Sequence, residues 1–311
     1  MKSQRNILFD SESTVMKVCT FLGLKKLRWS LRRLHCPVDK NSLVLEVGAG
    51  GNPYPRANVL LDAMESTIER NEQQLITDRP LVLGLCEELP FKDKSFDFVI
   101  ASHVLEHTDN PEAFLNELMR VGKSGYIETP DGWFEKLCAF TYHRLEVSEE
   151  NSSLIIKKKS SWKPDDISRA WDYKLSKSSE VRRLLRTNPD LNTMRFYWDN
   201  QFHYKILNPE INASWDYPIS EIKHKPQHNY LLFNMRNTYL RLRMFLFSQN
   251  RRNKQLDITS LLRCPTCHDE ALEYNINTIG CIKCKSIYEV INRIPKLFPK
   301  NIDGFNQKRL S

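Results

Sequence analysis

The segment that most restricts the fold is VLEVGAGGNPYPRANVLLD, residues 44–62. An apolar strand runs into Gly48 and Gly50, and glycine allows a sharp backbone turn that a ligand can approach without meeting a Cβ. Pro53 and Pro55 then stand where a helix would open, and proline opposes helix continuation there. The chain reaches a second apolar strand after 11 residues, fewer than the dozen or more usual between parallel strands. We therefore expect a loop without a helix between two neighbouring strands.

This loop predicts a nucleoside ligand that carries no phosphate. A dinucleotide site would have a third glycine at position 53 and a helix N-terminus aimed at the pyrophosphate, whereas position 53 is proline. Glu46 lies beneath the loop, which favours a cation. Asp62 ends the second strand, where a carboxylate can accept hydrogen bonds from both ribose hydroxyls. Asp62 can equally cap a helix that starts around MESTIER, residues 64–70, and residue patterns alone leave the two roles open.

Five apolar segments between residues 43 and 130 alternate with loops and helices. They are SLVLEVGAG, NVLLDA, PLVLGL, FDFVIAS and SGYIETP. Between the last two, Asn110 and Pro111 suit a helix start, Gly122 suits its end, and Phe114, Leu115, Leu118 and Met119 form its inward face. This alternation predicts an α/β fold with a mainly parallel sheet covered on both faces.

The remaining segments predict helices and hairpins around that sheet. Residues 11–36 read as one or two basic helices, with apolar positions Val15, Val18, Cys19, Leu22, Leu27, Leu31 and Leu34 packed against the sheet domain. RLEVSEENSSLIIKKK and MRFYWDNQFHYKIL each read as a hairpin, with a basic helix between them.

Residues 230–247 predict a helix that is apolar on two sides. One arc holds Leu231, Met235, Tyr239, Leu242 and Leu246, and another holds Phe233, Leu240, Met244 and Phe247. Arg236 and Arg243 separate the arcs. Such a helix is expected between two bodies or on a membrane surface. A polar linker, SQNRRNKQLD, follows.

Charge is unevenly distributed along the chain. The net charge is +8 overall, but residues 41–130 carry 7 Lys and Arg against 15 Asp and Glu. The basic flanks suit phosphate, acidic glycan or anionic lipid headgroups, or they simply keep the protein in solution. No run approaches a membrane span and the N-terminal residues do not resemble a signal peptide, so we expect a cytoplasmic protein, with a second expectation of contact with the inner membrane face.

Four of the eight cysteines form a metal-binding pattern. CPTC places Cys264 and Cys267, and CIKC places Cys281 and Cys284, with 13 residues between the pairs. Two such pairs supply four thiolates at the corners of a tetrahedron, which predicts a closed, structural zinc site. An iron–sulfur or redox role is the alternative.

The motifs VLEVGAG, VLLD, GLCEELPFKDKSFDFVIASHVLEHTDNPEAFLNELMRV and GYIETP together resemble the class I S-adenosylmethionine-dependent methyltransferases, specifically the type-11 group, over residues 42–131. The resemblance implies a seven-stranded, mostly parallel Rossmann-like sheet with S-adenosylmethionine across its carboxyl edge. It assigns residues to parts of the cofactor: Glu46, Gly48 and Gly50 to the methionine end, Asp62 to the ribose, Cys86 and Glu87 to the adenine, and Ala101, Ser102 and His103 to the sulfonium and methyl group. Where the family commonly has Asp before this segment, Leu85 stands here, which implies that main-chain groups hold the adenine.

Three histidines are candidate catalytic bases. A sulfonium methyl is already activated, so transfer needs mainly an acceptor in line, and a base helps an acceptor that must lose a proton. His103 and His107 lie four apart, which predicts one face of a helix, and His143 follows the fifth strand. Each of them can instead have a packing or capping role.

The segment LLRCPTCHDEALEYN…IGCIKCKSIYEVINRIPKLFP resembles the small zinc-ribbon activator subunit of several methyltransferases, over residues 260–300. The resemblance implies a module that covers an apolar edge of the catalytic domain, here supplied in cis. The predicted organisation is an N-terminal helical cover at 1–40, a methyltransferase domain with an α+β extension at 41–225, a connecting helix and linker at 226–255, and a zinc ribbon at 256–311.

The leading hypothesis is methyl transfer to an oxygen or nitrogen of a glycan or glycolipid intermediate. A tRNA or a translation-related protein is the alternative acceptor. A non-catalytic scaffold that binds S-adenosylmethionine is the alternative of another class.

Overall fold

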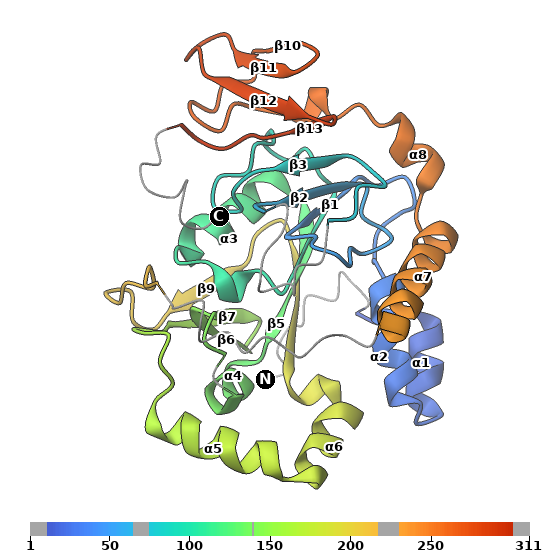
Figure 1. The fold of residues 1–311 in the computed structure, drawn as a ribbon, viewed down its shortest axis with the longest axis vertical. Coiled ribbons are helices and arrows are strands. Elements are labelled where there is room, and N and C mark those ends of the chain that lie inside the picture. The colour runs from blue at the N-terminus through green and yellow to red at the C-terminus, as the bar shows by residue number, and fades with distance from the viewer. Residues whose placement is uncertain (1–10, 65–74, 139, 217–229, 301–311) are drawn as a thin grey trace. The chain divides into compact units, whose positions relative to one another are not determined.

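The computed structural model describes residues 11–64, 75–138, 140–216 and 230–300 (Figure 1). The chain forms two compact units that interleave along the sequence. The first unit comprises Met1–Asp39, Ala101–Pro111 and Ser124–His228. The second unit comprises Lys40–Ile100, Glu112–Lys123 and Asn229–Ser311.

The main sheet is built from the apolar segments that the sequence predicts. Its strands are β1 (Val44–Val47), β2 (Val59–Asp62), β3 (Leu81–Leu83), β4 (Phe98–Ser102), β5 (Ser124–Pro130) and β8 (Thr193–Asp199). They are hydrogen-bonded in the order β3-β2-β1-β4-β5-β8. β1, β2 and β3 pair in parallel and are buried along their whole length, as strands covered on both faces must be. β8 pairs antiparallel to β5, so the sheet is mixed, with six strands in the described residues where the resemblance implies seven.

The connection between β1 and β2 has no helix, as predicted. Residues 51–58 form turns and bends and contain no helix. The helix α3 (Pro111–Val121) also follows the prediction, since Phe114, Leu115 and Leu118 are buried. The region around MESTIER lies mostly outside the described residues.

The first unit surrounds β5 and β8 with short helices and a second sheet. Its helices are α1 (Thr14–Phe21), α2 (Lys25–Leu31), α4 (Gly132–Cys138), α5 (Asp166–Lys177) and α6 (Ser179–Thr187). Three-residue helical turns are η1 (Arg32–Leu34), η3 (Leu105–His107) and η4 (Pro189–Leu191). The second sheet has the order β6-β7-β9, from β6 (Leu145–Glu150), β7 (Ser153–Lys158) and β9 (His203–Ile206).

Only one of the two predicted hairpins is present. β6 and β7 pair antiparallel, and Asn151 and Ser152 take positive φ values in the turn between them. The prediction for MRFYWDNQFHYKIL is wrong, because β8 joins β5 in the main sheet whereas β9 pairs in parallel with β7. Both strands find distant partners, which the alternation of side chains along a strand does not reveal.

The N-terminal helices form where predicted but bury a different face. Met16 and Cys19 are buried, whereas Val15, Val18, Leu22 and Leu27 are exposed. The predicted apolar face is therefore wrong at these four positions.

In the second unit, α7 (Tyr230–Phe247) has the predicted bounds but not two buried sides. Leu240 and Met244 of the second predicted arc are buried, whereas Met235 and Tyr239 of the first arc are exposed. Arg243 is also buried, and its guanidinium donates to the Asn52 side chain and to the Pro53 carbonyl at 3.1 Å.

The predicted polar linker contains a further helix, α8 (Asn250–Gln255). Its Asn253 is buried and accepts a hydrogen bond from Asn58 at 2.8 Å, and Arg252 donates to the carbonyls of Asn41 and Ser42. These bonds to the residues around β1 make the segment part of the second unit.

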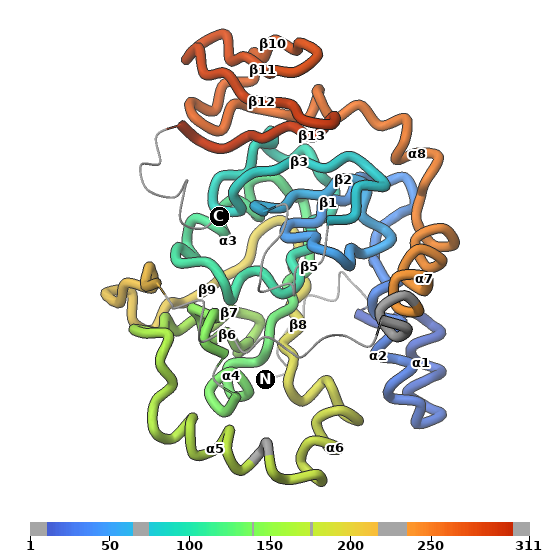
Figure 2. The backbone as a smooth tube through the Cα atoms, in the orientation of Figure 1, coloured from blue at the N-terminus to red at the C-terminus, as the bar shows by residue number. Residues whose placement is uncertain are grey.

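The C-terminal cysteine module, residues 259–297, continues the edge of the main sheet. It contains η6 (Thr259–Leu261) and a sheet of β10 (Leu272–Tyr274), β11 (Thr278–Cys281), β12 (Ile287–Ile291) and β13 (Ile294–Pro295). Figure 2 shows β13 running beside the edge strand β3. The Leu297 amide donates to the Leu83 carbonyl at 2.7 Å, and a Cβ on Gly84 would lie 3.0 Å from the Leu297 oxygen. Glycine at position 84 thus permits this close approach.

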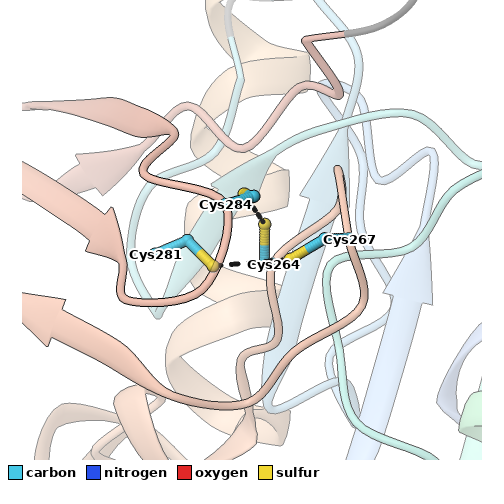
Figure 3. A group of neighbouring side chains, drawn as sticks. All are labelled: Cys264, Cys267, Cys281 and Cys284. Carbon is cyan, nitrogen blue, oxygen red and sulfur yellow. Dashed lines mark hydrogen bonds between the residues drawn. The ribbon is translucent and has the colours of Figure 1, made fainter.

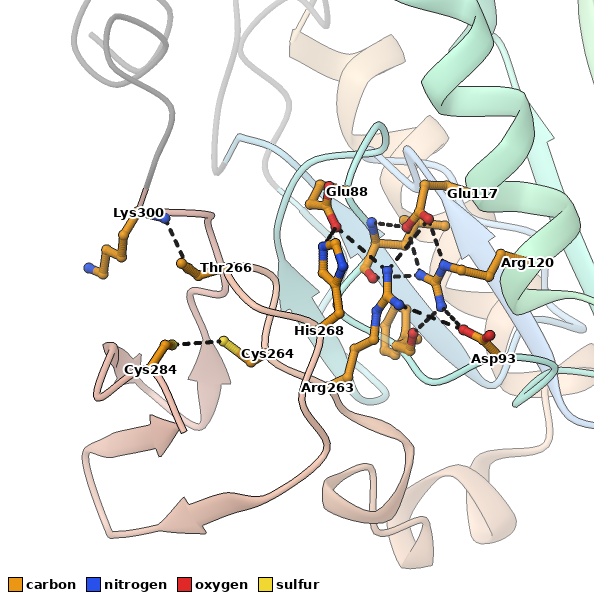
Figure 4. A network of polar contacts seen from close by, with 12 residues as sticks. Glu88, Asp93, Glu117, Arg120, Arg263, Cys264, Thr266, His268, Cys284 and Lys300 are labelled. Atoms are coloured by element: carbon orange, nitrogen blue, oxygen red, sulfur yellow. Dashed lines mark hydrogen bonds and ion pairs between the residues drawn. The ribbon is translucent and has the colours of Figure 1, made fainter. Parts of the chain in front are cut away.

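A network of ion pairs fixes the module to the sheet domain (Figure 4). The Arg263 guanidinium lies 3.6 Å from both Glu88 and Glu117 and 3.7 Å from Asp93. Arg120 on α3 binds the same Glu117 and Asp93, at 2.6 and 2.8 Å. Apolar residues of both parts are fully buried here: Phe91 forms a β-bridge with Leu262 of the module, and Leu297 of the module is buried where it contacts Leu83.

We expect Arg263→Ala to lower the free energy of unfolding by about 2 kcal/mol. The substitution removes a cation from the half-buried cluster, so that its acidic groups lose one of their partners. Urea unfolding followed by circular dichroism measures this loss. The control is Arg169→Ala, which breaks the exposed pair with Asp166 and should cost at most about 0.5 kcal/mol. Equal losses in the two variants would contradict a stabilising role for the network.

Candidate functional site

The glycine loop folds back on the end of β2 in the second unit. Gly48 and Gly50 have φ values of 68° and 54°, in the left-handed region that other residues avoid. The amides of Gly48 and Ala49 both donate to the Leu61 carbonyl, at 2.8 and 3.2 Å. A side chain at either glycine would strain this turn.

Two buried carboxylates hold the loop from both sides. Glu46 accepts a hydrogen bond from the Tyr54 amide at 2.6 Å, and Asp62 accepts one from the Gly50 amide at 2.9 Å. The side chains are 2% and 7% exposed, so each carboxylate places negative charge in a poorly solvated position. Asp62 also accepts from the Met64 amide at 3.1 Å. That bond is of the capping kind, so the ribose role of Asp62 stays a prediction.

Cys86 and Glu87 lie near Asp62. The Cys86 thiol is 3.1 Å from the Glu87 carboxylate. Burial, with the charges of Glu87 and Asp62, raises the pKa of the Cys86 thiol well above its usual value. The thiol is therefore neutral at physiological pH. The charge of Asp62 acts on Cys86, and the assignment of all six residues of the second unit to the cofactor stays a prediction.

The other predicted cofactor residues, Ala101, Ser102 and His103, belong to the first unit. Ala101 is fully buried. The Ser102 hydroxyl donates to the Glu128 carboxylate at 3.1 Å, and the His103 amide donates to the Glu128 carbonyl at 2.7 Å. His103 itself has a φ of 58°, an unusual conformation for a residue other than glycine.

Two carboxylates flank the His103 ring. Its Nδ1 lies 3.2 Å from Glu106 and its Nε2 lies 3.4 Å from Glu128. Desolvation alone would lower the pKa of His103, but the hydrogen bonds and charges of Glu106 and Glu128 outweigh it and raise the pKa to about 10. At neutral pH the ring is therefore an imidazolium, which donates hydrogen bonds and has no lone pair with which to act as a general base.

Glu128 is the residue that sequence reasoning missed. It is fully buried on β5 and accepts hydrogen bonds from Arg32 at 2.9 and 3.0 Å and from the Tyr126 hydroxyl. Burial would raise the pKa of Glu128, but His103 and Arg32 hold it well below its usual value. The sequence did contain a signal, because Glu128 is the one charged residue in the apolar strand GYIETP. A carboxylate buried in such a strand needs a cationic partner.

His107 and His143 form a second cluster in the same unit. The expected helix carrying His103 and His107 on one face is absent, because residues 105–107 form only the short turn η3. His107 instead packs against the His143 ring, with 4.8 Å between centroids, and the Nδ1 of His143 is 2.6 Å from the buried Glu135. Three side chains of this cluster could bind a metal ion, because each offers one ligand atom and these atoms lie within 4.8 Å of one another: Glu106, His107 and His143. Their predicted role as bases stays a prediction.

The four module cysteines converge in Figure 3. Their sulfur atoms all lie within 4.8 Å of one another, and the Sγ atoms are 3.6 Å apart for Cys264 and Cys284 and 3.5 Å apart for Cys267 and Cys281. A tetrahedral site with Zn–S bonds of ~2.3 Å has sulfur atoms roughly 3.8 Å apart. All eight cysteines are free thiols, so the four of the module are available as ligands. Their spacing is close to that of a tetrahedral zinc site, and the set therefore fits a zinc ion.

We expect the His103 ring to stay protonated throughout the neutral range. The raised pKa stabilises the fold fully below the unfolded value of about 6.5, and this contribution is lost as the pH rises through about 10. NMR titration of the histidine ring resonances measures the pKa directly, and Glu106→Gln should lower it. A wild-type His103 that titrates near 6.5 would contradict the proposed pairing.

Comparisons with known proteins identify a domain in the N-terminal half of the chain. Residues 45–127 match the family described as a methyltransferase domain. An uncharacterized methyltransferase of Schizosaccharomyces pombe is 35% identical over 107 residues, 28% of this chain and 38% of that protein. An uncharacterized protein of Methanocaldococcus jannaschii is 42% identical over 84 residues, 26% of this chain and 40% of that protein. The chain thus matches about two fifths of the length of these curated relatives.

Solved structures that align with this chain include the complex between the Haloferax volcanii Trm112 methyltransferase activator and a methyltransferase. The match is 17% identical, covers 61% of this chain and 95% of that chain, and has a TM-score of 0.35. An S-adenosylmethionine-dependent methyltransferase from Mesorhizobium loti is 11% identical, with 55% and 95% covered and a TM-score of 0.31. The domain match and the strand order together identify a Rossmann-like methyltransferase fold with a mixed sheet.

Proposed function

We propose that this protein is an S-adenosylmethionine-dependent methyltransferase. The observation that carries the proposal is the glycine loop held between the buried Glu46 and Asp62 carboxylates, within the segment that matches the methyltransferase domain. This arrangement offers bare backbone and negative charge, and no helix follows the loop to hold a phosphate. A nucleoside that carries a sulfonium cation fits these three properties.

The proposed roles follow from position and charge. Asp62 accepts hydrogen bonds from the ribose hydroxyls, and Glu46 attracts the cationic methionine end. S-adenosylmethionine supplies a methyl group already activated by its positive sulfur, so the protein needs mainly to orient an acceptor. His103, whose side chain is 47% exposed, donates hydrogen bonds as an imidazolium. An oxygen or nitrogen acceptor that loses a proton would therefore rely on another base, and His107 and His143 remain the candidates.

The proposed acceptor is a glycan or glycolipid intermediate. The net charge of +8 supports an acceptor that carries phosphate or other anionic groups. The alternative acceptor, a tRNA or a translation-related protein, is supported by the exposed arginines Arg182, Arg183 and Arg186 on α6.

We further propose that the cysteine module binds a structural zinc ion and stabilises the domain in cis. Four thiolates leave no open coordination position, which suits a structural site. The Tyr288 hydroxyl lies 3.1 Å from Cys264 and the Ser286 hydroxyl 3.2 Å from Cys284, so hydrogen bonds would support the thiolates. Through the contact of β13 with β3, the module would cover the edge of the main sheet, as an activator subunit covers an edge of its methyltransferase.

Calorimetry with S-adenosylmethionine tests the proposed function. We expect binding to the wild type and a loss of about tenfold or more in Asp62→Asn, because a charged acceptor of the ribose hydroxyls becomes neutral. The control is Asp199→Asn at an exposed position, which should leave affinity unchanged. Thermal unfolding of each variant shows whether the loop remains folded. Wild-type protein with no affinity for the cofactor or its demethylated product would contradict the proposal.

Metal analysis tests the proposed zinc site. We expect about one zinc per chain, and Cys281→Ser with Cys284→Ser should abolish it and lower the unfolding temperature, because zinc binding supplies folding energy to a small module. Cys36→Ser, outside the cluster, serves as the control. Iron with visible absorption, or no metal at all in protein purified without chelator, would contradict a zinc site.

A further inference from the structure

One face of α7 exposes a continuous apolar surface. At about 100° per residue, five of its exposed large apolar side chains fall within an arc of roughly 120°, and the exposed Phe247 at the C-terminal end lies outside that arc. The five are Met235, Tyr239, Leu242, Phe245 and Leu246, between 54% and 74% exposed. The opposite side holds the buried Leu240 and Met244, and the buried Arg243 lies between the two sides. Single exposed apolar side chains need no explanation, but a contiguous patch of this kind marks an interaction surface.

Arginines lie at both edges of this apolar face. Arg241 follows one edge and Arg236 the other at the helical period. Residues 230–255, which span α7 and α8, hold six Lys and Arg residues and no Asp or Glu. A groove of about 930 Å³ lies along the helix, and its lining includes Arg236, Arg241, Lys254 and one acid, Asp78, beside Leu240 and Phe245. The surface therefore combines apolar side chains with an excess of positive charge.

We propose that α7 docks on an anionic membrane surface, lying in the plane of the interface. The apolar face would insert into the boundary between headgroups and acyl chains, while the flanking Arg236 and Arg241 would bind lipid phosphates. This placement is independent of methyl transfer. It also accounts for the large apolar side chains that one face of this helix exposes.

Charge argues for a lipid surface rather than for a second copy of this chain. Two α7 helices packed face to face would bring the arginines at the edges of one helix close to those of the other. Residues 230–255 contain no Asp or Glu that could pair with them, and like charges oppose such a contact. Among the described residues, no helix is long and apolar enough to cross a bilayer. α7 would accordingly lie on the membrane and not span it.

Flotation of the full chain with vesicles tests the proposal. We expect binding to vesicles of phosphatidylcholine and phosphatidylglycerol at least about tenfold stronger than to phosphatidylcholine alone. The double variant Leu242→Glu with Phe245→Glu should lose about tenfold or more of this affinity. Arg241→Gln should lose about fivefold. Ile276→Glu makes the same chemical change at a residue 93% exposed in the cysteine module and should bind as the wild type does.

Three results would overturn the proposal. One is a wild type that does not bind anionic vesicles, and another is a double variant that binds them equally well. The third is a wild-type dimer, seen by analytical ultracentrifugation, that the double variant converts into a monomer, because a second copy would then cover the face. The altered side chains are exposed, so the unfolding temperature should not change, and circular dichroism verifies that each variant is folded.

Discussion

The hydrogen bond from the Gly50 amide to Asp62 depends on a turn that only glycine adopts without strain. Gly48 and Gly50 both lie in the left-handed region, and the loop returns to the Leu61 carbonyl at the end of β2. Pro53 and Pro55 prevent a helix between β1 and β2. A side chain from a distant segment stabilises this loop instead, because Arg243 on α7 donates to the Pro53 carbonyl. The proposed cofactor site thus depends on a short loop stabilised by two buried acids and one distant arginine.

Buried charge organises the first unit in a similar way. Glu128 sits on β5 without exposure to solvent, and Arg32, Ser102 and His103 all bind it. Removing water from such a carboxylate is costly unless cations compensate it, and here an arginine and an imidazolium do so. The same interaction that stabilises the strand also fixes the protonation state of His103. His103, which the resemblance assigns to the methyl site, is thereby a hydrogen-bond donor at neutral pH.

Local patterns in the sequence predicted the local structure well. Continuous apolar runs located β1 to β5, and the loop prolines correctly excluded a helix. Helical periodicity gave the bounds of α7 but not its buried side, because two apolar arcs compete and only tertiary packing selects between them. The pairing of β8 with β5 and the contact between Arg32 and Glu128, 96 residues apart, depend on which distant segments meet. Alternation, charge and spacing contain no information on that choice.

The central claim is that the glycine loop and its acids hold S-adenosylmethionine. Ultraviolet cross-linking with methyl-labelled S-adenosylmethionine, followed by mass mapping of the labelled peptides, tests the location directly. The account predicts label in peptides that contain residues 46–62 or Cys86, and competition by the demethylated product. Label confined to peptides from α7 or the cysteine module, or label that the product does not displace, would contradict it.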